Sequence, residues 1–140
     1  MLIRSIQLSD YASVTQLLGN VMSESCYEET MEVFARQLSW DSDLVLVALE
    51  DNQAVGMIMG NIENSKGYYY RIAVDNPFQR KGIGKSLIES LKNRFIKRNV
   101  NQILITMDSH NEPLLPLYES LGYRNEDFLR SIKEISIVNG

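Results

Sequence analysis

The stretch that decides the fold runs from residue 72 to residue 91 and reads IAVDNPFQRKGIGKSLIESL. It begins as an apolar strand and then turns through a segment that contains Pro77 and Gly82. The spacing predicts a helix after this turn, because Ile83, Leu87 and Leu91 recur every four residues and so share one face. A strand, a tight turn and an amphipathic helix therefore follow one another directly.

Three cations crowd the start of this helix, which is an unfavourable place for them. A helix N-terminus already carries about half a positive charge, so carboxylates are favoured there. Here Arg80, Lys81 and Lys85 occupy the turn, and two glycines allow a close approach to the backbone. Locally unfavourable arrangements are expected mainly at functional sites. A bound polyanion, held by free backbone N–H groups and basic side chains, would compensate for them.

Two common phosphate-binding loops do not fit the spacing. A nucleoside-triphosphate P-loop needs a glycine five positions before the glycine that precedes its lysine, and Gln79 stands there. A dinucleotide-binding fingerprint needs a third glycine where this chain has Leu87. A solvated basic turn that binds nothing stays open from these residues alone.

Two motifs resemble those of the GNAT superfamily, the acyl-CoA-dependent N-acetyltransferases. Residues 79–84, QRKGIG, are similar to the family's (Gln/Arg)-x-x-Gly-x-(Gly/Ala) motif. Residues 111–123, NEPLLPLYESLGY, resemble its Asn-x6-Tyr-Glu-x-Leu-Gly-(Phe/Tyr) segment with the spacing intact. One helix and one strand separate the motifs, and the resemblance covers most of the chain.

The resemblance implies a site for acetyl-CoA, used as a co-substrate. The strand before the turn would pair its backbone with the pantetheine amides, the turn would surround the pyrophosphate, and Asn111 would help to hold the pantetheine arm. From the residues alone, Asn111 could cap the next helix, and the two roles are compatible because a cap uses the side-chain oxygen and leaves the amide nitrogen free. The residues expected at the cofactor are Ile72, Ala73, Val74, Gln79, Arg80, Lys81, Gly82, Ile83, Gly84, Lys85, Ser86, Asn111 and Tyr118.

The implied chemistry is attack of an amine on a thioester, which needs no enzyme nucleophile. Tyr118 matches the family's tyrosine that protonates the departing thiolate, and a phenol is a suitable donor at neutral pH. A core aromatic residue is the other interpretation of this position. In the subgroup that acetylates ribosomal proteins, a glutamate stands where this chain has Thr106. Asp108 acting through a water is the first candidate for the base; an exposed carboxylate at the strand end and deprotonation by solvent stay open.

Little in the sequence identifies the acceptor amine. Glu28 and Glu29 belong to an acidic run on an early helix, where the family's acceptor site is commonly bordered. Such a run would attract a cationic amine, although it is also typical of a solvated helix face. Tyr70 is a candidate for the pocket wall, and core packing is the alternative for it.

Composition agrees with a single N-acetyltransferase domain over residues 1–140, with an apolar share of 44% and a net charge of −4. No apolar run reaches the roughly 18–20 residues that span a bilayer, and we expect no membrane partner. The acidic balance disfavours nucleic acid, and the single histidine and cysteine predict no metal site. A lone Cys26 favours a cytoplasmic location. No pattern decides whether the terminal strands form a homodimer.

The expected fold class is mixed α/β of the α+β type, with a central, mostly antiparallel mixed sheet and helices on both faces. The expected order is β-α-α-β-β-β-α-β-α-β-β. Strands are expected from Leu2 to about Leu8, and at 44–49, 54–62, 68–74 and 102–107. One short helix is expected after residue 10, and further helices at 23–38, 83–95 and 112–121. Turns are expected at 50–53 and around 66–67, and a terminal hairpin over 123–140 with a turn near Arg130.

The sequence thus predicts a cytoplasmic enzyme that transfers an acetyl group from acetyl-CoA to a primary amine of a small molecule or peptide. A protein acetyltransferase for an N-terminus or a lysine is the alternative within this class. A non-catalytic module that binds or senses acyl-CoA is the alternative from another class.

Overall fold

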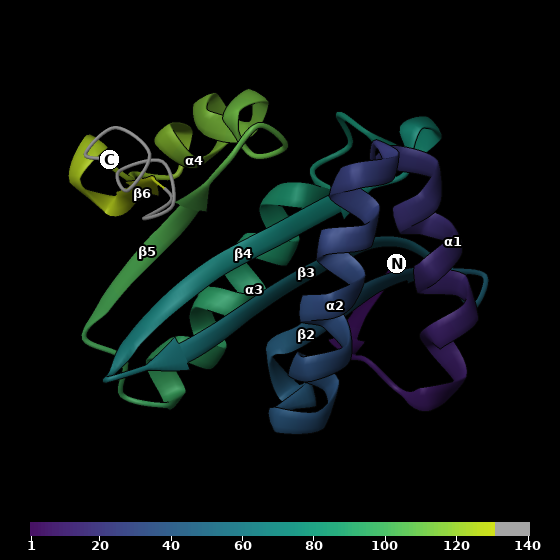
Figure 1. Ribbon diagram of the computed structural model, residues 1–140, viewed down its shortest axis with the longest axis horizontal. Helices are drawn as coiled ribbons and strands as arrows, with labels where there is room; N and C mark the ends of the chain where they lie inside the picture. Colours follow the sequence, from purple (N-terminus) through teal and green to yellow (C-terminus); the bar gives the residue numbers. More distant parts are fainter. Residues whose placement is uncertain (131–140) are drawn as a thin grey trace.

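The computed structural model describes residues 1–130, which form one mixed sheet with helices on both faces (Figure 1). The six strands are β1 (Leu2–Ser5), β2 (Val45–Glu50), β3 (Gln53–Glu63), β4 (Lys66–Val74), β5 (Gln102–Met107) and β6 (Phe128–Arg130). The helices are α1 (Tyr11–Val21), α2 (Glu24–Trp40), α3 (Ile83–Lys97) and α4 (Leu115–Ser120). The strands lie in chain order across the sheet, with β1 to β4 antiparallel and β5 and β6 added in parallel.

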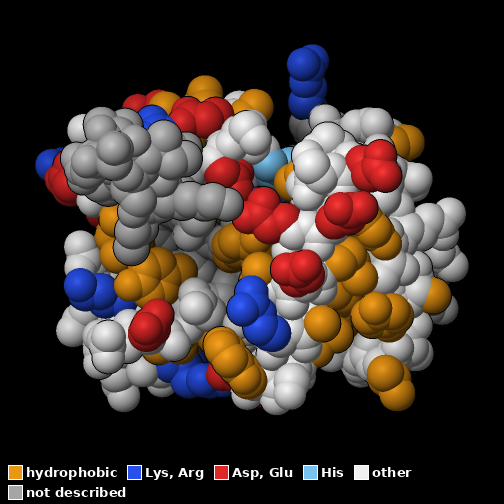
Figure 2. Space-filling model, in the orientation of Figure 1, with side chains coloured by type: hydrophobic (Ala, Val, Ile, Leu, Met, Phe, Trp, Pro, Cys, Tyr) orange, Lys and Arg blue, Asp and Glu red, His pale blue; other side chains and the backbone are white. Residues whose placement is uncertain are grey.

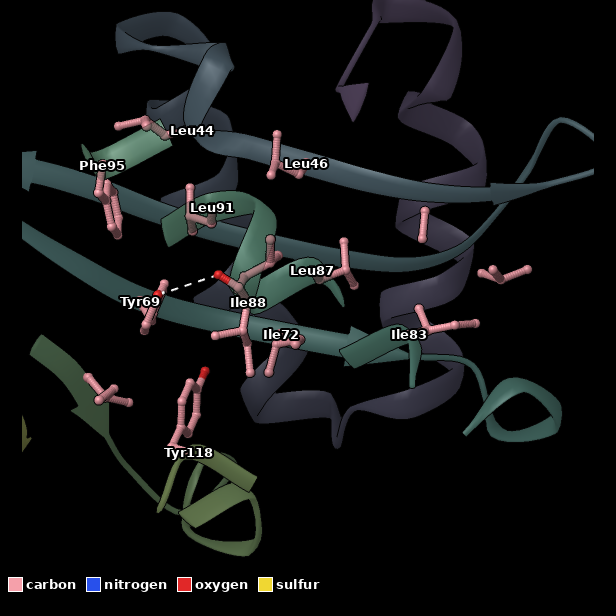
Figure 3. Packing of buried hydrophobic residues seen from close by; sticks show 14 of the residues in the cluster. Leu44, Leu46, Tyr69, Ile72, Ile83, Leu87, Ile88, Leu91, Phe95 and Tyr118 are labelled. Atoms are coloured by element: carbon pink, nitrogen blue, oxygen red, sulfur yellow. Dashed lines mark hydrogen bonds between the residues drawn. The ribbon is translucent and has the colours of Figure 1, made fainter. Parts of the chain in front are cut away.

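Each face of the sheet has its own apolar core. On one face, α3 buries Ile83, Leu87, Leu91 and Phe95, the row that the four-residue spacing predicts (Figure 3). On the other face, α1 and α2 pack against alternate residues of β2 and β3, including Val45. The β2 strand is therefore buried on both sides, which explains its nearly continuous apolar sequence.

The face of α2 that packs on the sheet carries the expected Phe34, with Met31 and Leu38 partly buried beside it, and it also includes polar residues. Ser23 begins the helix by accepting a hydrogen bond from the Cys26 amide at 3.3 Å. The fully buried positions are Thr30, Phe34 and Gln37, whereas Ala35 is exposed. Two polar side chains thus face the sheet, and one of them becomes important at the site described below.

Two tight turns join β2 to β3 and β3 to β4. Asp51 and Asn52 both have positive φ values, as do Asn64 and Ser65, which is typical of two-residue hairpin turns. The first turn lies within the loop predicted at 50–53. The second corrects the expectation of a turn around residues 66–67, because Lys66 already pairs with Glu63.

Three terminal boundaries also differ from expectation. The first strand ends at Ser5, and Leu8, expected within it, is 93% exposed in a 3-10 turn. The helix expected at 112–121 is a 3-10 turn, η4 (Glu112–Leu114), followed by α4, and Gly122 follows with a φ of 98°. The expected turn near Arg130 is wrong, since Arg130 ends β6; the rest of the expected hairpin, residues 131–140, lies outside the described part of the chain.

A β-bulge in β4 prepares the functional site. Met59 and Gly60 are neighbours on β3, but their partners on β4 are Arg71 and Tyr69, so Tyr70 is an extra residue. A bulge interrupts the alternation of side chains between the two faces. Tyr69 packs in the α3-side core, while Tyr70 and Arg71 both contact the α2 side.

We predict that Gly60→Ala lowers the free energy of unfolding by about 1–3 kcal/mol, the usual cost of overpacking a core. A Cβ at this position would lie 2.5 Å from the Tyr68 carbonyl oxygen and 2.9 Å from Leu91 Cδ2. Gly19→Ala in α1 is the matched control, because its nearest neighbour would lie at 3.8 Å. Urea unfolding should show a loss for the first variant alone; equal stability of both would contradict the packing seen at Gly60.

Candidate active site

A groove opens where β4 and β5 separate. The two strands pair from Lys66 and Gln102 only as far as Tyr69 and Ile105, and beyond these residues they diverge (Figure 1). A cavity of about 510 Å³ lies at this end of the sheet. Its walls come from the end of β4, the turn before α3, and η4 with α4: Ile72, Val74, Phe78, Gln79, Arg80, Gly82, Gly84, Lys85, Pro113, Leu114 and Leu117.

The N-terminus of α3 presents backbone donors at this groove. Gly82 begins the helix with a φ of 82°, a conformation that glycine adopts without strain. The first helical hydrogen bond runs from the Ser86 amide to the Gly82 carbonyl at 3.0 Å. The amides of Ile83, Gly84 and Lys85 therefore have no acceptor within the helix and are suited to bind an anion.

The basic side chains of the turn lie around these donors. Arg80 and Lys85 line the groove, and Lys81 is exposed with its Nζ 5.5 Å from the centre of the Phe78 ring. Arg80 has a φ of 63°, which is unusual for a residue with a side chain. The first turn of α3 contains no acidic residue. The positive charge at this helix end is thus not neutralised from within its first turn.

Several expected cofactor residues have other contacts. Gln79 donates from Nε2 to the Val74 carbonyl at 2.9 Å and to Asn76 Oδ1 at 3.0 Å, so it braces the turn. The side chain of Ala73 is buried in the α2-side core. Ile83 is buried beneath α3, which leaves only its backbone amide for the groove, and Ser86 does not line the cavity.

Asn111 connects the diverging strands. Its Nδ2 donates to the Tyr70 carbonyl of β4 at 2.9 Å and to the Thr106 carbonyl of β5 at 2.6 Å. These two acceptors fix the orientation of the amide, because only the nitrogen can donate. Asn111 Oδ1 is buried and has no partner among the described residues. The side chain does not cap the following helix.

Tyr118 projects from α4 toward β4 and α3, as Figure 3 shows. The side chain is 1% exposed and stacks on Tyr69, with 5.7 Å between ring centres. Burial raises the pKa of its phenol above the ordinary value, so the hydroxyl is protonated at neutral pH. No group within residues 1–130 hydrogen-bonds this hydroxyl, whereas Tyr69 and Tyr123 bond to each other at 2.6 Å.

Asp108 is held by three donors from two parts of the chain. Its Oδ2 forms an ion pair with Nη1 of Arg71 at 2.6 Å. Its Oδ1 accepts from the backbone amides of His110 at 3.1 Å and Asn111 at 3.0 Å. A carboxylate offers about four acceptor positions, so this one keeps a single position for a water or substrate proton.

His110, two residues after Asp108 in the sequence, and Arg71, which the sequence does not single out, complete the surroundings of Asp108. His110 Nε2 lies 3.4 Å from the Ile72 carbonyl oxygen, and burial lowers the pKa of the imidazole, which is therefore neutral at pH 7. Arg71 is only 1% exposed and donates from Nε to Thr30 Oγ1 at 3.0 Å. A lone arginine within an apolar strand carries no local signal of such a contact, because Thr30 lies far away in the sequence.

A second cavity, of about 340 Å³, lies between α2 and the exposed part of β3 to β5. Tyr70 lines it together with Trp40, Tyr68 and Thr106, and the Tyr70 hydroxyl is buried without a partner among the described residues. Glu28 and Glu29 are exposed on α2 outside this cavity. Acidic side chains gather along this helix next to the pale-blue histidine in Figure 2.

Two further findings come from residues 1–130. Their histidine, cysteine and acidic side chains include no cluster of three that could hold a metal ion. None of their helices is both long enough and apolar enough to cross a bilayer.

The diverging strands and the basic helix N-terminus define the class, an acyltransferase that uses acyl-coenzyme A. The chain belongs to the acetyltransferase (GNAT) family, which matches residues 11–123, and it is an acetyl-CoA-dependent N-acetyltransferase.

Solved structures share this fold. The PaiA N-acetyltransferase of Thermoplasma acidophilum, crystallised with coenzyme A, is 18% identical with a TM-score of 0.74, over 88% of this chain and 89% of that chain. The ribosomal-protein-S18-alanine N-acetyltransferase of Escherichia coli is 22% identical with a TM-score of 0.68, over 88% and 77%. An aminoglycoside 6'-N-acetyltransferase of Acinetobacter haemolyticus is 18% identical with a TM-score of 0.71, over 89% and 92%.

We predict that Gly82→Ala weakens coenzyme A binding about tenfold, because a side chain disfavours the left-handed backbone conformation that orients the free amides by about 1–2 kcal/mol. Gly84→Ala is the matched control in the same turn, where the new Cβ would lie 3.5 Å from Leu117 Cδ2 in ordinary contact. Calorimetric titration with coenzyme A measures both. Equal affinities would show that the backbone conformation at Gly82 does not govern binding.

Proposed function

We propose that this enzyme transfers the acetyl group of acetyl-CoA to a primary amine of a small molecule or peptide, with Tyr118 as the general acid. The observation that carries the proposal is the Tyr118 hydroxyl. It is protonated, it has no hydrogen-bond partner within residues 1–130, and Leu117 beside it lines the groove. Gln79, Arg80, Lys81, Lys85 and the amides of α3 would hold the pyrophosphate, and Ile72 and Val74 the pantetheine.

The groove fits this co-substrate chemically. The free amides and cations suit a diphosphate, and the apolar walls from Ile72, Leu114 and Leu117 suit an aliphatic arm. The buried Asn111 Oδ1 is a hydrogen-bond acceptor without a partner in residues 1–130, and an amide N–H of the pantetheine would donate to it.

In the proposed reaction, the neutral amine nitrogen bonds to the acyl carbon and the carbon–sulfur bond breaks. The departing thiolate takes its proton from the Tyr118 hydroxyl. The amine loses a proton to Asp108 through a water, using the acceptor position that Arg71 leaves free. The neutral imidazole of His110 is the second candidate for this proton, because its Nε2 lies 3.4 Å from the carbonyl oxygen of Ile72, a residue that lines the groove.

We further propose that the acceptor is cationic and approaches along α2. Glu28 and Glu29 are exposed there, and the Glu29 carboxylate is one of the charges that raise the pKa of Tyr70, after the larger effect of burial. A negative rim attracts ammonium groups and would raise their concentration beside the site. Tyr70 would form part of the acceptor pocket.

The setting of this activity is proposed from the sequence. We infer one domain over residues 1–140, a cytoplasmic location from the lone Cys26, and no nucleic-acid or membrane partner.

A protein N-terminus or lysine is the second candidate acceptor. The cavity beside α2 supports it, because its aromatic wall of Trp40, Tyr68 and Tyr70 could receive a neighbouring residue of a peptide.

A screen of acceptors tests the proposal. Amines, polyamines, amino acids, peptides and a lysine-bearing protein are incubated with acetyl-CoA, and release of free thiol is followed. Turnover with small amines or short peptides supports the proposed function, and preference for a protein supports the second candidate. Turnover with none of these acceptors would contradict the proposed substrate class.

Removal of the Tyr118 hydroxyl tests its role as an acid. We expect Tyr118→Phe to lower kcat by about 10²-fold or more, the usual contribution of general acid catalysis, with coenzyme A affinity within about twofold. In the wild type, the raised pKa of Tyr118 predicts no loss of kcat on the alkaline side up to about pH 10, where an unshifted phenol would be half deprotonated.

Tyr123→Phe deletes a neighbouring hydroxyl that bonds to Tyr69, so it is the control for a purely structural effect. A kcat for Tyr118→Phe that equals the kcat of this control would remove the proposed acid.

Charge reversal on α2 tests the acidic rim. Glu28→Lys/Glu29→Lys should raise the KM for a cationic acceptor about tenfold by repulsion and leave the KM for acetyl-CoA unchanged. Glu89→Lys/Glu126→Lys makes the same change in net charge at exposed positions elsewhere. An equal KM for both double variants would show that the rim does not attract the acceptor.

A further inference from the structure

The end of the β4–β5 ladder raises a problem of hydrogen bonding. Beyond Tyr69 and Ile105 the strands no longer pair, yet β4 continues to Val74 and β5 to Met107. Carbonyl groups there lie inside the molecule, where unpaired backbone groups are unfavourable. Asn111 donates hydrogen bonds from its side-chain nitrogen to two of these carbonyl groups, those of Tyr70 and Thr106.

Asn111 can do this only if its own backbone is held in place. The Asn111 amide donates to Asp108 Oδ1 at 3.0 Å, and Asp108 Oδ2 is paired with Arg71 at 2.6 Å. The Arg71 side chain is anchored in turn, because its Nε donates to Thr30 of α2 and its guanidinium lies 4.6 Å from the centre of the Tyr70 ring.

These contacts form a closed connection, which we name the strand clasp: Tyr70 and Arg71 of β4, and Thr106, Asp108 and Asn111 at the end of β5. The bulge at Tyr70 makes the clasp possible, since it leaves Arg71 on the α2 side with Tyr70. Among the buried side-chain nitrogen and oxygen atoms of the clasp, only Asn111 Oδ1 and the Tyr70 hydroxyl have no hydrogen-bond partner within residues 1–130.

We propose that the Arg71–Asp108 ion pair positions Asn111 for the pantetheine arm of coenzyme A, which makes Arg71 a positioning residue for cofactor binding. The pair fixes the loop that carries Asn111, and Asn111 holds the strands at one separation with Oδ1 left for a ligand N–H. This inference rests on the cofactor placement proposed above.

A pair of variants separates positioning from stability. Arg71→Met alone leaves the Asp108 carboxylate unpaired, which is unfavourable for a partly buried charge. Arg71→Met/Asp108→Asn removes both charges and keeps an amide oxygen that can accept from His110 and Asn111. We expect the double variant to recover much of the lost stability in urea, while its Kd for coenzyme A stays at least about tenfold above the wild type.

ADP is the second probe, because it carries the diphosphate without the pantetheine. The double variant should bind ADP within about twofold of the wild type, since the clasp does not contact the turn before α3. Arg4→Met/Asp10→Asn is the matched control: this pair is also 2.6 Å long, and Asp10 likewise accepts a backbone amide, from Gln7. It should alter stability and leave both affinities unchanged.

A Kd for coenzyme A within twofold of the wild type in Arg71→Met/Asp108→Asn would overturn the inference, as would an equal loss of ADP binding. Arg80→Gln/Lys81→Gln/Lys85→Gln tests the placement itself and should weaken both ligands. If this triple variant binds coenzyme A normally, the placement is wrong; if it fails while the Arg71 double variant binds normally, only the positioning role is wrong.

Discussion

The separation of β4 from β5 beyond Tyr69 and Ile105 is the constraint on which the site depends. A sheet that parts in this way exposes backbone donors and acceptors to a groove, and these can pair with an extended ligand as a neighbouring strand would. The ends of the two strands must also be held at a fixed separation, so that they neither pair with each other nor become disordered. Side chains at the ends of the two strands provide this support, and the unpaired oxygen of Asn111 lies at their centre.

A second constraint acts at the start of α3. Free amides, the partial charge of the helix and three cations all favour an anion at one place. The glycine at position 82 makes this geometry accessible, and the apolar row of α3 anchors the helix firmly to the sheet. Without a bound anion, the positive charges at the N-terminus of α3 are therefore unfavourable. The helix, about four turns long, is held in place by its buried apolar row.

The sequence predicted the elements that repeat a simple pattern. The helix beginning at Ile83 follows a four-residue apolar period, and β5 has the predicted bounds because it is short, apolar and flanked by polar residues. Mixed topology and helices on both faces followed from the order of such elements.

Features that depend on distant partners could not be predicted from the sequence. Arg71 reads as a charge at the surface, and its burial depends on Thr30 and Asp108, which only the fold brings near. Thr30 and Gln37 of α2 are polar, so hydrophobicity alone does not predict that they are buried while Ala35 is exposed. The candidate acid Tyr118 came from its place in a motif; its burial against Tyr69 is tertiary information.

The extra residue at Tyr70 has an evolutionary consequence. A deletion of Tyr70 would restore regular pairing with β3 and would leave Tyr69 and Arg71 on their present faces, because successive side chains of a regular strand alternate. It would also remove the Tyr70 side chain from the wall of the cavity beside α2, and it would take away the Tyr70 carbonyl that accepts from Asn111. Insertions and deletions should therefore be tolerated in the hairpin at Asn64 and Ser65 long before they are tolerated in the middle of β4.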